Sequence, residues 1–268
     1  MENHPFKYDI DFIEPGVVHF EDNIDSSFYL IEGRDKALLI DTGCGGGNVH
    51  RLASAFTEKP IELAVTHAHG DHDAHAGEFT VAYMHPADIA QLEEMNRRFG
   101  VPEEQQLHAD LFTPVSGGDV IELGDCPVRV LEMAGHTPGS VLFVDEGHKV
   151  VFTGDAVGSG VGVWMQLANC CCISQYRHNL LELLEQLAPY RDYLYLGGHY
   201  RQAGDPASPS FNPVTPRMIE DLVVVCDELL AGKARSEEYA PAGRFGEEVT
   251  YIAYHGTAAL VYLPSYVK

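Results

Sequence analysis

Three histidines and an aspartate lie within six residues of one another in the first third of the chain. Residues 66–77 read T-H-A-H-G-D-H-D-A-H-A-G and follow the largely apolar run at 61–65. A run of this length with β-branched residues is typical of a buried strand, and α/β proteins place their sites at the carboxyl ends of such strands. We therefore expect the strand to present this cluster at a sheet edge. The cluster consists of His67, His69, Asp71 and His72.

Imidazole and carboxylate groups are ligands that Zn²⁺ prefers, and a catalytic zinc keeps one position open for water. This short loop offers more of these groups than one ion needs. A sharp turn at Gly70 would let His67 and His69 face one ion. Asp71 and His72 would then face a second. A lone histidine near a strand is usually an ordinary core or surface residue, but four metal-competent side chains at this spacing favour a dinuclear site.

Three more candidate ligands each come directly after a predicted strand and a glycine. Glycine allows the backbone to turn tightly at such a place. If the first loop supplies two ions, the remaining ligands have to arrive from other strand ends, and these residues stand there. They are His136 in A-G-H-T-P-G-S, Asp155 in F-T-G-D and His199 in L-G-G-H-Y.

The motif H-x-H-x-D-H and the three later segments resemble, in order and local sequence, the metallo-β-lactamase superfamily of metallohydrolases. The resemblance covers about residues 27–199 and leaves the C-terminal quarter unassigned. It implies an α+β fold, a four-layer αββα sandwich of two mixed sheets with outer helices and the metals at one edge. It departs from the family after His72, where residues 73–77 stand in place of an early glycine pair. We expect His75 in this segment to be solvated or to support the site rather than bind metal.

The resemblance also implies how the ligands divide between two ions. One ion would be bound by His67, His69 and His136. The other would be bound by Asp71, His72 and His199. Asp155 would bridge the two ions. Asp41, in the D-T-G that closes an early strand, would orient a ligand histidine through a hydrogen bond.

Two divalent cations about 3.5–4 Å apart can share a water and hold it as hydroxide near neutral pH. The expected cofactors are two zinc ions, with iron or manganese as alternatives. Asp71 is also expected to accept or relay a proton while it remains a ligand. The predicted function is a dinuclear zinc hydrolase whose hydroxide attacks a small ester, thioester or lactone, similar to the glyoxalase II and lactonase branches.

Other functions remain open at this point. A phosphodiesterase would use the same site, and a persulfide dioxygenase keeps the motif but holds a single iron. Flavodiiron relatives typically have an acidic residue in place of His69, and a non-catalytic metal-binding protein is disfavoured by the complete ligand set. Glyoxalase II members bind glutathione with basic residues near the C-terminus. Here Lys233, Arg235 and Arg244 are not obviously clustered, which argues against glutathione.

Composition limits the partners. The chain has 268 residues with 40 acidic and 17 basic side chains, a formal charge of −23, which argues against a nucleic-acid substrate. No apolar stretch approaches membrane-spanning length, and residues 1–13 have no signal-peptide core. The six cysteines contain no C-x-x-C pair, which favours a cytoplasmic location. We expect a small-molecule substrate, no nucleic acid and no membrane, and the sequence allows a homo-oligomer.

The predicted elements are strands in blocks with helices between them. Strands are predicted at 17–20, 27–31, 37–40, 61–65, 81–84, 120–123, 128–133, 141–145, 150–152, 193–196, 249–253 and 258–262. Helices are predicted at 48–56, 86–99, 174–187 and 215–230, the third with Ser174 as its N-cap. This pattern favours two packed sheets with outer helices, and the absence of a linker predicts one domain over residues 1–268.

Two segments without clear periodicity are expected to form the wall of the substrate pocket. These are residues 156–173, with Trp164 and Met165, and residues 200–216, with Arg201 and Phe211. For Trp164, core packing is an equal alternative to pocket lining. Within the first segment, Cys170, Cys171 and Cys172 are expected to be small buried packing residues, because consecutive side chains point in different directions and cannot readily bind one ion.

Overall fold

Two mixed sheets pack against each other and enclose the central core. The computed structural model describes residues 8–14, 16–22, 26–158, 162–199, 214–244 and 246–268. In the first sheet seven strands lie in sequence order, antiparallel from β1 to β4 and parallel from β4 to β7. They are β1 (Asp9–Glu14), β2 (Val17–Glu21), β3 (Ser27–Glu32), β4 (Ala37–Ile40), β5 (Ile61–Ala64), β6 (Ala82–Met84) and β7 (Phe112–Pro114).

The second sheet has five strands in the order β13-β11-β10-β9-β8. They are β8 (Val120–Glu122), β9 (Pro127–Glu132), β10 (Val141–Asp145), β11 (Val150–Gly154) and β13 (Leu194–Gly197). β13 runs parallel to β11, and the other neighbours are antiparallel. Alternate side chains of each sheet point to opposite faces. Tyr29 and Ile31 of β3 therefore meet Phe143 and Phe152 of the second sheet in the central core.

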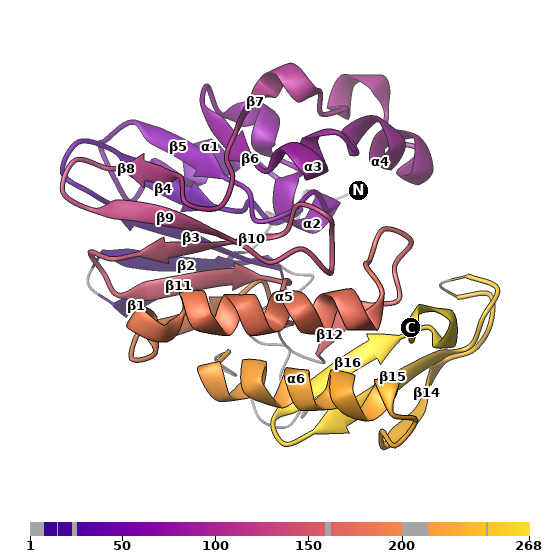
Figure 1. Cartoon of the computed structure of the whole chain (residues 1–268). Helices are drawn as coiled ribbons and strands as arrows, with labels where there is room; N and C mark the ends of the chain where they lie inside the picture. Colours follow the sequence, from indigo (N-terminus) through magenta and orange to yellow (C-terminus); the bar gives the residue numbers. More distant parts are fainter. Residues whose placement is uncertain (1–7, 15, 23–25, 159–161, 200–213, 245) are drawn as a thin grey trace.

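Helices cover the outer faces of both sheets, so the predicted αββα layering is confirmed. On the first sheet lie α1 (Val49–Ala53), α2 (Gly70–Asp73), α3 (Pro86–Ile89) and α4 (Leu92–Phe99). Phe28 and Leu30 of β3 face this side and pack with Val49 and Leu92 of the helices. The second sheet is covered by α5 (Ile173–Gln186) and α6 (Pro216–Leu230), which lie side by side on the opposite side of the molecule from α3 and α4 (Figure 1).

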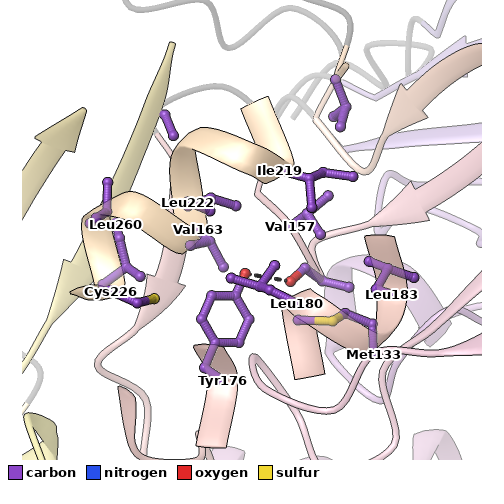
Figure 2. Packing of buried hydrophobic residues seen from close by; sticks show 14 of the residues in the cluster. Met133, Val157, Val163, Tyr176, Leu180, Leu183, Ile219, Leu222, Cys226 and Leu260 are labelled. Atoms are coloured by element: carbon purple, nitrogen blue, oxygen red, sulfur yellow. Dashed lines mark hydrogen bonds between the residues drawn. The ribbon is translucent and has the colours of Figure 1, made fainter. Parts of the chain in front are cut away.

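A third sheet was not predicted from the sequence. Its four strands have the order β12-β16-β15-β14. They are β12 (Val163–Met165), β14 (Ser236–Ala240), β15 (Thr250–His255) and β16 (Ala258–Tyr262). This sheet packs on α6, and its Val163 and Leu260 join α5 and α6 in one apolar cluster (Figure 2). In the same cluster the buried Tyr176 donates a hydrogen bond to the carbonyl of Ala156 at 2.8 Å.

Two predictions about helices were wrong in detail. The helix predicted at 86–99 is interrupted, because α3 ends at Ile89 and α4 begins at Leu92. The break lets Asp88 remain fixed by neighbouring loops while Leu92 packs in the core. Ser174 is not the N-cap of α5, since Ile173 is drawn into the core and already begins the helix. The amide of Ser174 instead donates to the carbonyl of Lys268.

The remaining regular structure is short. The part of the chain that the structure describes has five 3₁₀ turns, at Ala76–Glu78, Glu103–Gln105, Ala109–Leu111, Ala188–Tyr190 and Pro264–Tyr266. Among the described residues, no helix combines the length and apolar character needed to cross a bilayer. The single domain over residues 1–268 stays a prediction.

Candidate metal centre

The histidine loop begins where β5 ends, as predicted, but it turns in a different way. His69 has extended backbone, with φ −117° and ψ 145°, and caps the one-turn helix α2. The amides of His72 and Asp73 donate to the carbonyl of His69. Gly70 needs no unusual conformation, and a Cβ placed there would meet nothing within 4 Å. The sharp turn predicted at Gly70 is therefore wrong, and α2 turns the chain instead.

The structure brings all seven predicted ligands together from four loops. His69 Nδ1 lies 3.0 Å from His136 Nε2. On the other side of the cluster, His199 Nε2 is 3.2 Å from Asp155 Oδ2 and 3.6 Å from Asp71 Oδ2. These contacts join the loop after β5 to loops after β9, β11 and β13.

The seven side chains form three overlapping groups, in each of which the ligand atoms lie within 4.8 Å of one another. The groups are His67, His69 and His136; Asp71, His72 and His199; and His67, His72 and Asp155. Asp155 lies between the first two groups, with its Oδ2 3.8 Å from the Nε2 atoms of both His72 and His136. The first two groups contain the same residues as the two expected ligand sets, and the assignment of ions and of the bridge to them stays a prediction.

Several inward-facing atoms of the cluster lack hydrogen-bond partners among the described residues. They are His67 Nε2, His72 Nε2 and Asp155 Oδ1, all buried. Buried polar atoms are rarely left unpaired, because the loss of hydration is costly. The opposite nitrogen of each of the two rings is held, His67 Nδ1 by Thr66 Oγ1 at 3.0 Å and His72 Nδ1 by Asp41 Oδ2 at 2.9 Å. The donor set and its orphaned atoms therefore fit divalent cations.

Asp41 supports the cluster from behind. It is 2 % exposed and has the left-handed φ of +62°. Its carboxylate accepts from Thr66 N at 2.7 Å and Thr66 Oγ1 at 2.8 Å, in addition to its contact with His72. The predicted contact between Asp41 and a candidate ligand histidine is thus confirmed.

Asp88 is a supporting residue that the sequence did not predict. It is 1 % exposed, and its Oδ2 accepts from Ala68 N and Thr137 Oγ1, both at 2.8 Å. Its Oδ1 accepts from Gly139 N at 2.6 Å. One carboxylate therefore ties the loop of His67 to the loop of His136. In the sequence Asp88 is an acidic residue near the start of a helix, so no local signal marked it.

Glycines permit the close approach of two ligand loops. Gly154, before Asp155, has φ +48°, and a Cβ there would collide with the side chain of Thr66. A Cβ at Gly198 would lie 2.5 Å from Asp155 Oδ1 and 2.6 Å from His72 Cε1. The predicted tight turn is thus found at Gly154, whereas Gly198 is required for the close approach of its neighbours.

The imidazoles of the cluster fall into two electrostatic classes. Burial lowers the pKa of His67 well below its usual value and that of His69 to about 3. Burial opposes protonation of His72 and His199 too, but nearby carboxylates outweigh it. They raise the pKa of His72 well above its usual value and that of His199 to about 9. Despite burial, His199 and His72 hold the pKa of Asp155 well below its usual range. Because the pKa values of His72 and His199 are raised, cations that bind here would displace protons from these two rings.

The other residues singled out in the sequence have mixed outcomes. His75 is in none of the candidate metal groups, and its ring lies between Glu78 Oε1 at 3.0 Å and the carbonyl of Gly45 at 2.7 Å. Met165 is buried in the core, whereas Trp164 is half-buried and its carbonyl holds His136 Nδ1 at 2.8 Å. The expected pocket residues Arg201 and Phe211 lie outside the described residues. The cysteines at 170–172 are half-buried rather than buried, and Cys170 and Cys171 pack against the apolar cluster around α5 and α6, in agreement with the predicted packing role.

Residues 22–199 match the family model of the metallo-beta-lactamase superfamily. The chain belongs to this superfamily. It is 27% identical to an acyl-coenzyme A thioesterase, MBLAC2, of Gallus gallus over 213 residues, which cover 69% of this chain and 76% of that protein. It is 30% identical to the hydroxyacylglutathione hydrolase GloC of Haemophilus influenzae over 141 residues, 47% of this chain and 63% of that one.

A solved structure supports the fold. A metallo-beta-lactamase from Pontibacter korlensis superposes with a TM-score of 0.62 at 13% identity, covering 82% of this chain and 99% of that one. Membership of the superfamily and the named relatives indicate a hydrolase, and the clustered histidines and carboxylates are its candidate metal-binding groups.

Proposed function

We propose that this protein is a dinuclear zinc hydrolase that cleaves small thioesters. The observation that carries the proposal is the convergence of seven metal-competent side chains, with buried atoms of His67, His72 and Asp155 that lack partners among the described residues. Esters and lactones react by the same chemistry. Thioesters are favoured because both an acyl-coenzyme A thioesterase and a hydroxyacylglutathione hydrolase are among the relatives.

Two ions would be held by the groups described above. His67, His69 and His136 would bind one. Asp71, His72 and His199 would bind the other. Asp155, between the groups, would contact both. Bound ions would lower the pKa of a water molecule and polarise the carbonyl of the substrate.

Side chains of the protein would transfer the proton and position the ligand loops. Hydrolysis breaks the C–S bond, forms a C–O bond and yields a carboxylate and a thiol, so a proton passes from the attacking water towards the leaving sulfur. Asp71 is the group that we propose to hold this proton. Its side chain is 34% exposed, so it lies where the cluster meets solvent, and its Oδ2 is 3.6 Å from His199 Nε2. Asp41 and Asp88 would keep the ligand loops in position.

Metal content is the first test. Protein purified without added metal should contain about two zinc ions per chain, and a thioester should be hydrolysed. One iron per chain with oxygen uptake on a persulfide would instead establish a dioxygenase and overturn the proposal. A panel of thioesters, lactones and phosphodiesters separates the hydrolases, and turnover of phosphodiesters alone would reject acyl transfer.

Variants test the ligands. His69→Ala and Asp155→Ala should abolish turnover and lower the zinc content while circular dichroism shows a folded chain. His75→Gln is the matched control, because this neighbouring histidine contacts Glu78 and Gly45 rather than the cluster. It should retain two zinc ions. Full activity in either ligand variant would contradict the dinuclear site.

A further inference from the structure

A second cluster of metal-competent side chains lies at the opposite end of the second sheet from the candidate metal centre. It consists of Cys126, Asp145 and His148, whose ligand atoms all lie within 4.8 Å of one another. Cys126 comes directly before β9, whereas His136 of the centre follows the same strand. The six residues of β9 span about 20 Å of extended chain, so the two clusters are separate.

Two hairpin turns bring the three side chains together. Asp145 ends β10 and His148 lies in the turn that leads to β11, while Cys126 lies in the turn between β8 and β9. Val128 of β9 pairs with Asp145, which places the two turns side by side. Gly147 permits the close approach, because a Cβ at that position would lie 2.6 Å from Cys126 Sγ. An ion bound by the cluster would therefore link the two turns.

The ligand atoms are largely buried and converge on a small volume. Cys126 is 3 % exposed, Asp145 is fully buried and the side chain of His148 is 17 % exposed. Cys126 Sγ lies 2.8 Å from Asp145 Oδ1 and 3.8 Å from His148 Nδ1, which is 2.6 Å from Asp145 Oδ2. Around a tetrahedral zinc, with bonds of about 2.0–2.3 Å, donor atoms lie about 3.3–3.5 Å apart. The two short contacts would thus have to open by about 0.7 Å for an ion to enter.

An ion in this cluster would take the place of two protons. The thiol of Cys126 donates to Asp145 Oδ1, and the ring of His148 donates to Asp145 Oδ2. Both protons therefore point at the carboxylate, where a cation would also bind. The carboxylate is held in place besides, because its Oδ1 accepts from the amides of Gly147 at 2.9 Å and His148 at 3.0 Å.

The removal of these protons makes the cluster a weaker site than the candidate metal centre. Burial and the neighbouring Asp145 raise the pKa of the Cys126 thiol to about 12, and the hydrogen bond to Asp145 raises the pKa of His148. A cation has to displace protons that are held this firmly. The centre, in contrast, contains buried ligand atoms without hydrogen-bond partners among the described residues. We therefore expect the centre to fill first, and this cluster to fill when metal is added.

We propose that Cys126, Asp145 and His148 bind a further zinc ion, which links two turns of the second sheet. A thiolate, an imidazole and a carboxylate are all zinc ligands, and a water molecule would complete a tetrahedral set. On binding, the sulfur and the ring nitrogen release their protons to solvent. The inference goes beyond the proposed function and does not depend on it, because none of the three residues belongs to the candidate metal centre.

Cobalt provides a test that reports on this site. The seven candidate ligands of the centre are imidazoles and carboxylates, so cobalt there cannot give the charge-transfer band of a thiolate bound to Co²⁺. Zinc-loaded wild type titrated with Co²⁺ should develop this band up to about one ion per chain. Cys126→Ser, whose hydroxyl can still donate to Asp145, should show no band, and His148→Gln should need more cobalt to develop it. Cys172→Ser is the matched control, because this half-buried cysteine contacts Ser174 and lies outside the cluster.

Equilibrium dialysis against zinc gives a second readout. Wild type and Cys172→Ser should bind about one more zinc ion per chain than Cys126→Ser and His148→Gln, whatever the centre holds. A thiolate band that persists in folded Cys126→Ser, or a wild type without the band, would overturn the inference. If Cys126→Ser does not fold, His148→Gln decides, since it keeps the thiol and lacks one ligand. Equal zinc and cobalt binding by His148→Gln and wild type would then reject the site.

Discussion

Replacing Asp41 by asparagine tests whether this buried carboxylate sets the position of the proton on His72. Asp41 accepts three hydrogen bonds, from Thr66 N, Thr66 Oγ1 and His72 Nδ1, at 2.7 to 2.9 Å. Asparagine has the same size but only one accepting oxygen. If that oxygen keeps the bond to Thr66 N, the new NH₂ group faces His72 Nδ1. His72 then has to accept at Nδ1 and carry its proton on Nε2, the atom that faces the metal cluster.

The magnitude follows from the hydrogen bond that is lost. A hydrogen bond to a charged group contributes about 1.5–3 kcal/mol, and partners behind metal ligands are typically worth about 10- to 100-fold in affinity. Asp41→Asn should therefore weaken the zinc ion held through His72 by about 10- to 100-fold. The ion held by the other group should weaken less, because Asp41 reaches its ligand His67 only through the hydroxyl of Thr66. Competition with a chromophoric chelator, followed as zinc released per chain, measures both sites.

Asp221→Asn provides the matched control. Asp221, in the first half of α6, is 1 % exposed and accepts from Thr257 N at 2.8 Å and Thr257 Oγ1 at 3.0 Å. The control should lower the free energy of unfolding without changing zinc affinity. The reasoning is refuted if folded Asp41→Asn binds both ions with wild-type affinity, or if both ions weaken equally.

Three further predictions concern single contacts. Gly198→Ala should lower the zinc content, because its Cβ would lie 2.5 Å from Asp155 Oδ1. Gly70→Ala is the control and should keep the zinc content, because its Cβ would meet nothing within 4 Å. Metal analysis checks both variants. The hydrogen bond to Asp145 raises the pKa of His148 and, against burial, helps to lower that of Asp145. The contribution of Asp145 to the free energy of unfolding is present above about pH 4. The contribution of His148 is complete below about pH 6.5 and is lost as the pH rises through its raised pKa. His148→Gln should thus cost on the order of 1 kcal/mol near pH 5.5 and less near pH 9 in urea unfolding. Tyr176→Phe should cost about 1–3 kcal/mol by the same assay, because a buried carbonyl loses its donor.

The candidate ligands were predictable because each is marked by local sequence. A strand-like run and a glycine precede His136, Asp155 and His199, and the run before His67 ends in the motif itself. Strand ends expose side chains at a shared edge of the sheet. The position of these residues after predicted strands was therefore enough to predict that they converge. The layers were predictable for the same reason, since both sheets alternate or bury apolar residues over several strands.

What could not be predicted depends on contacts between distant segments. β12 is only three residues long and exists because Val163 pairs with Leu260 of β16, which no local pattern indicates. Asp88 looks like an ordinary acidic residue in the first turn of a helix until Thr137 and Gly139, about fifty residues away, approach it. The expected turn at Gly70 failed because glycine permits a sharp turn without requiring one.

The two predicted metal groups share a property that ties the fold to the chemistry. Each takes side chains from the loop of the first sheet and at least one histidine from the second, His136 in one group and His199 in the other. Main-chain hydrogen bonds join the sheets at the same edge, from Val141 N to the carbonyl of Thr66 and from Ser27 N to that of Gly198. Neither group is therefore complete in a sheet alone. A cation that binds both sheets but not the unfolded chain adds its binding free energy to the stability of the sandwich, so this edge links metal affinity to the packing of the whole core.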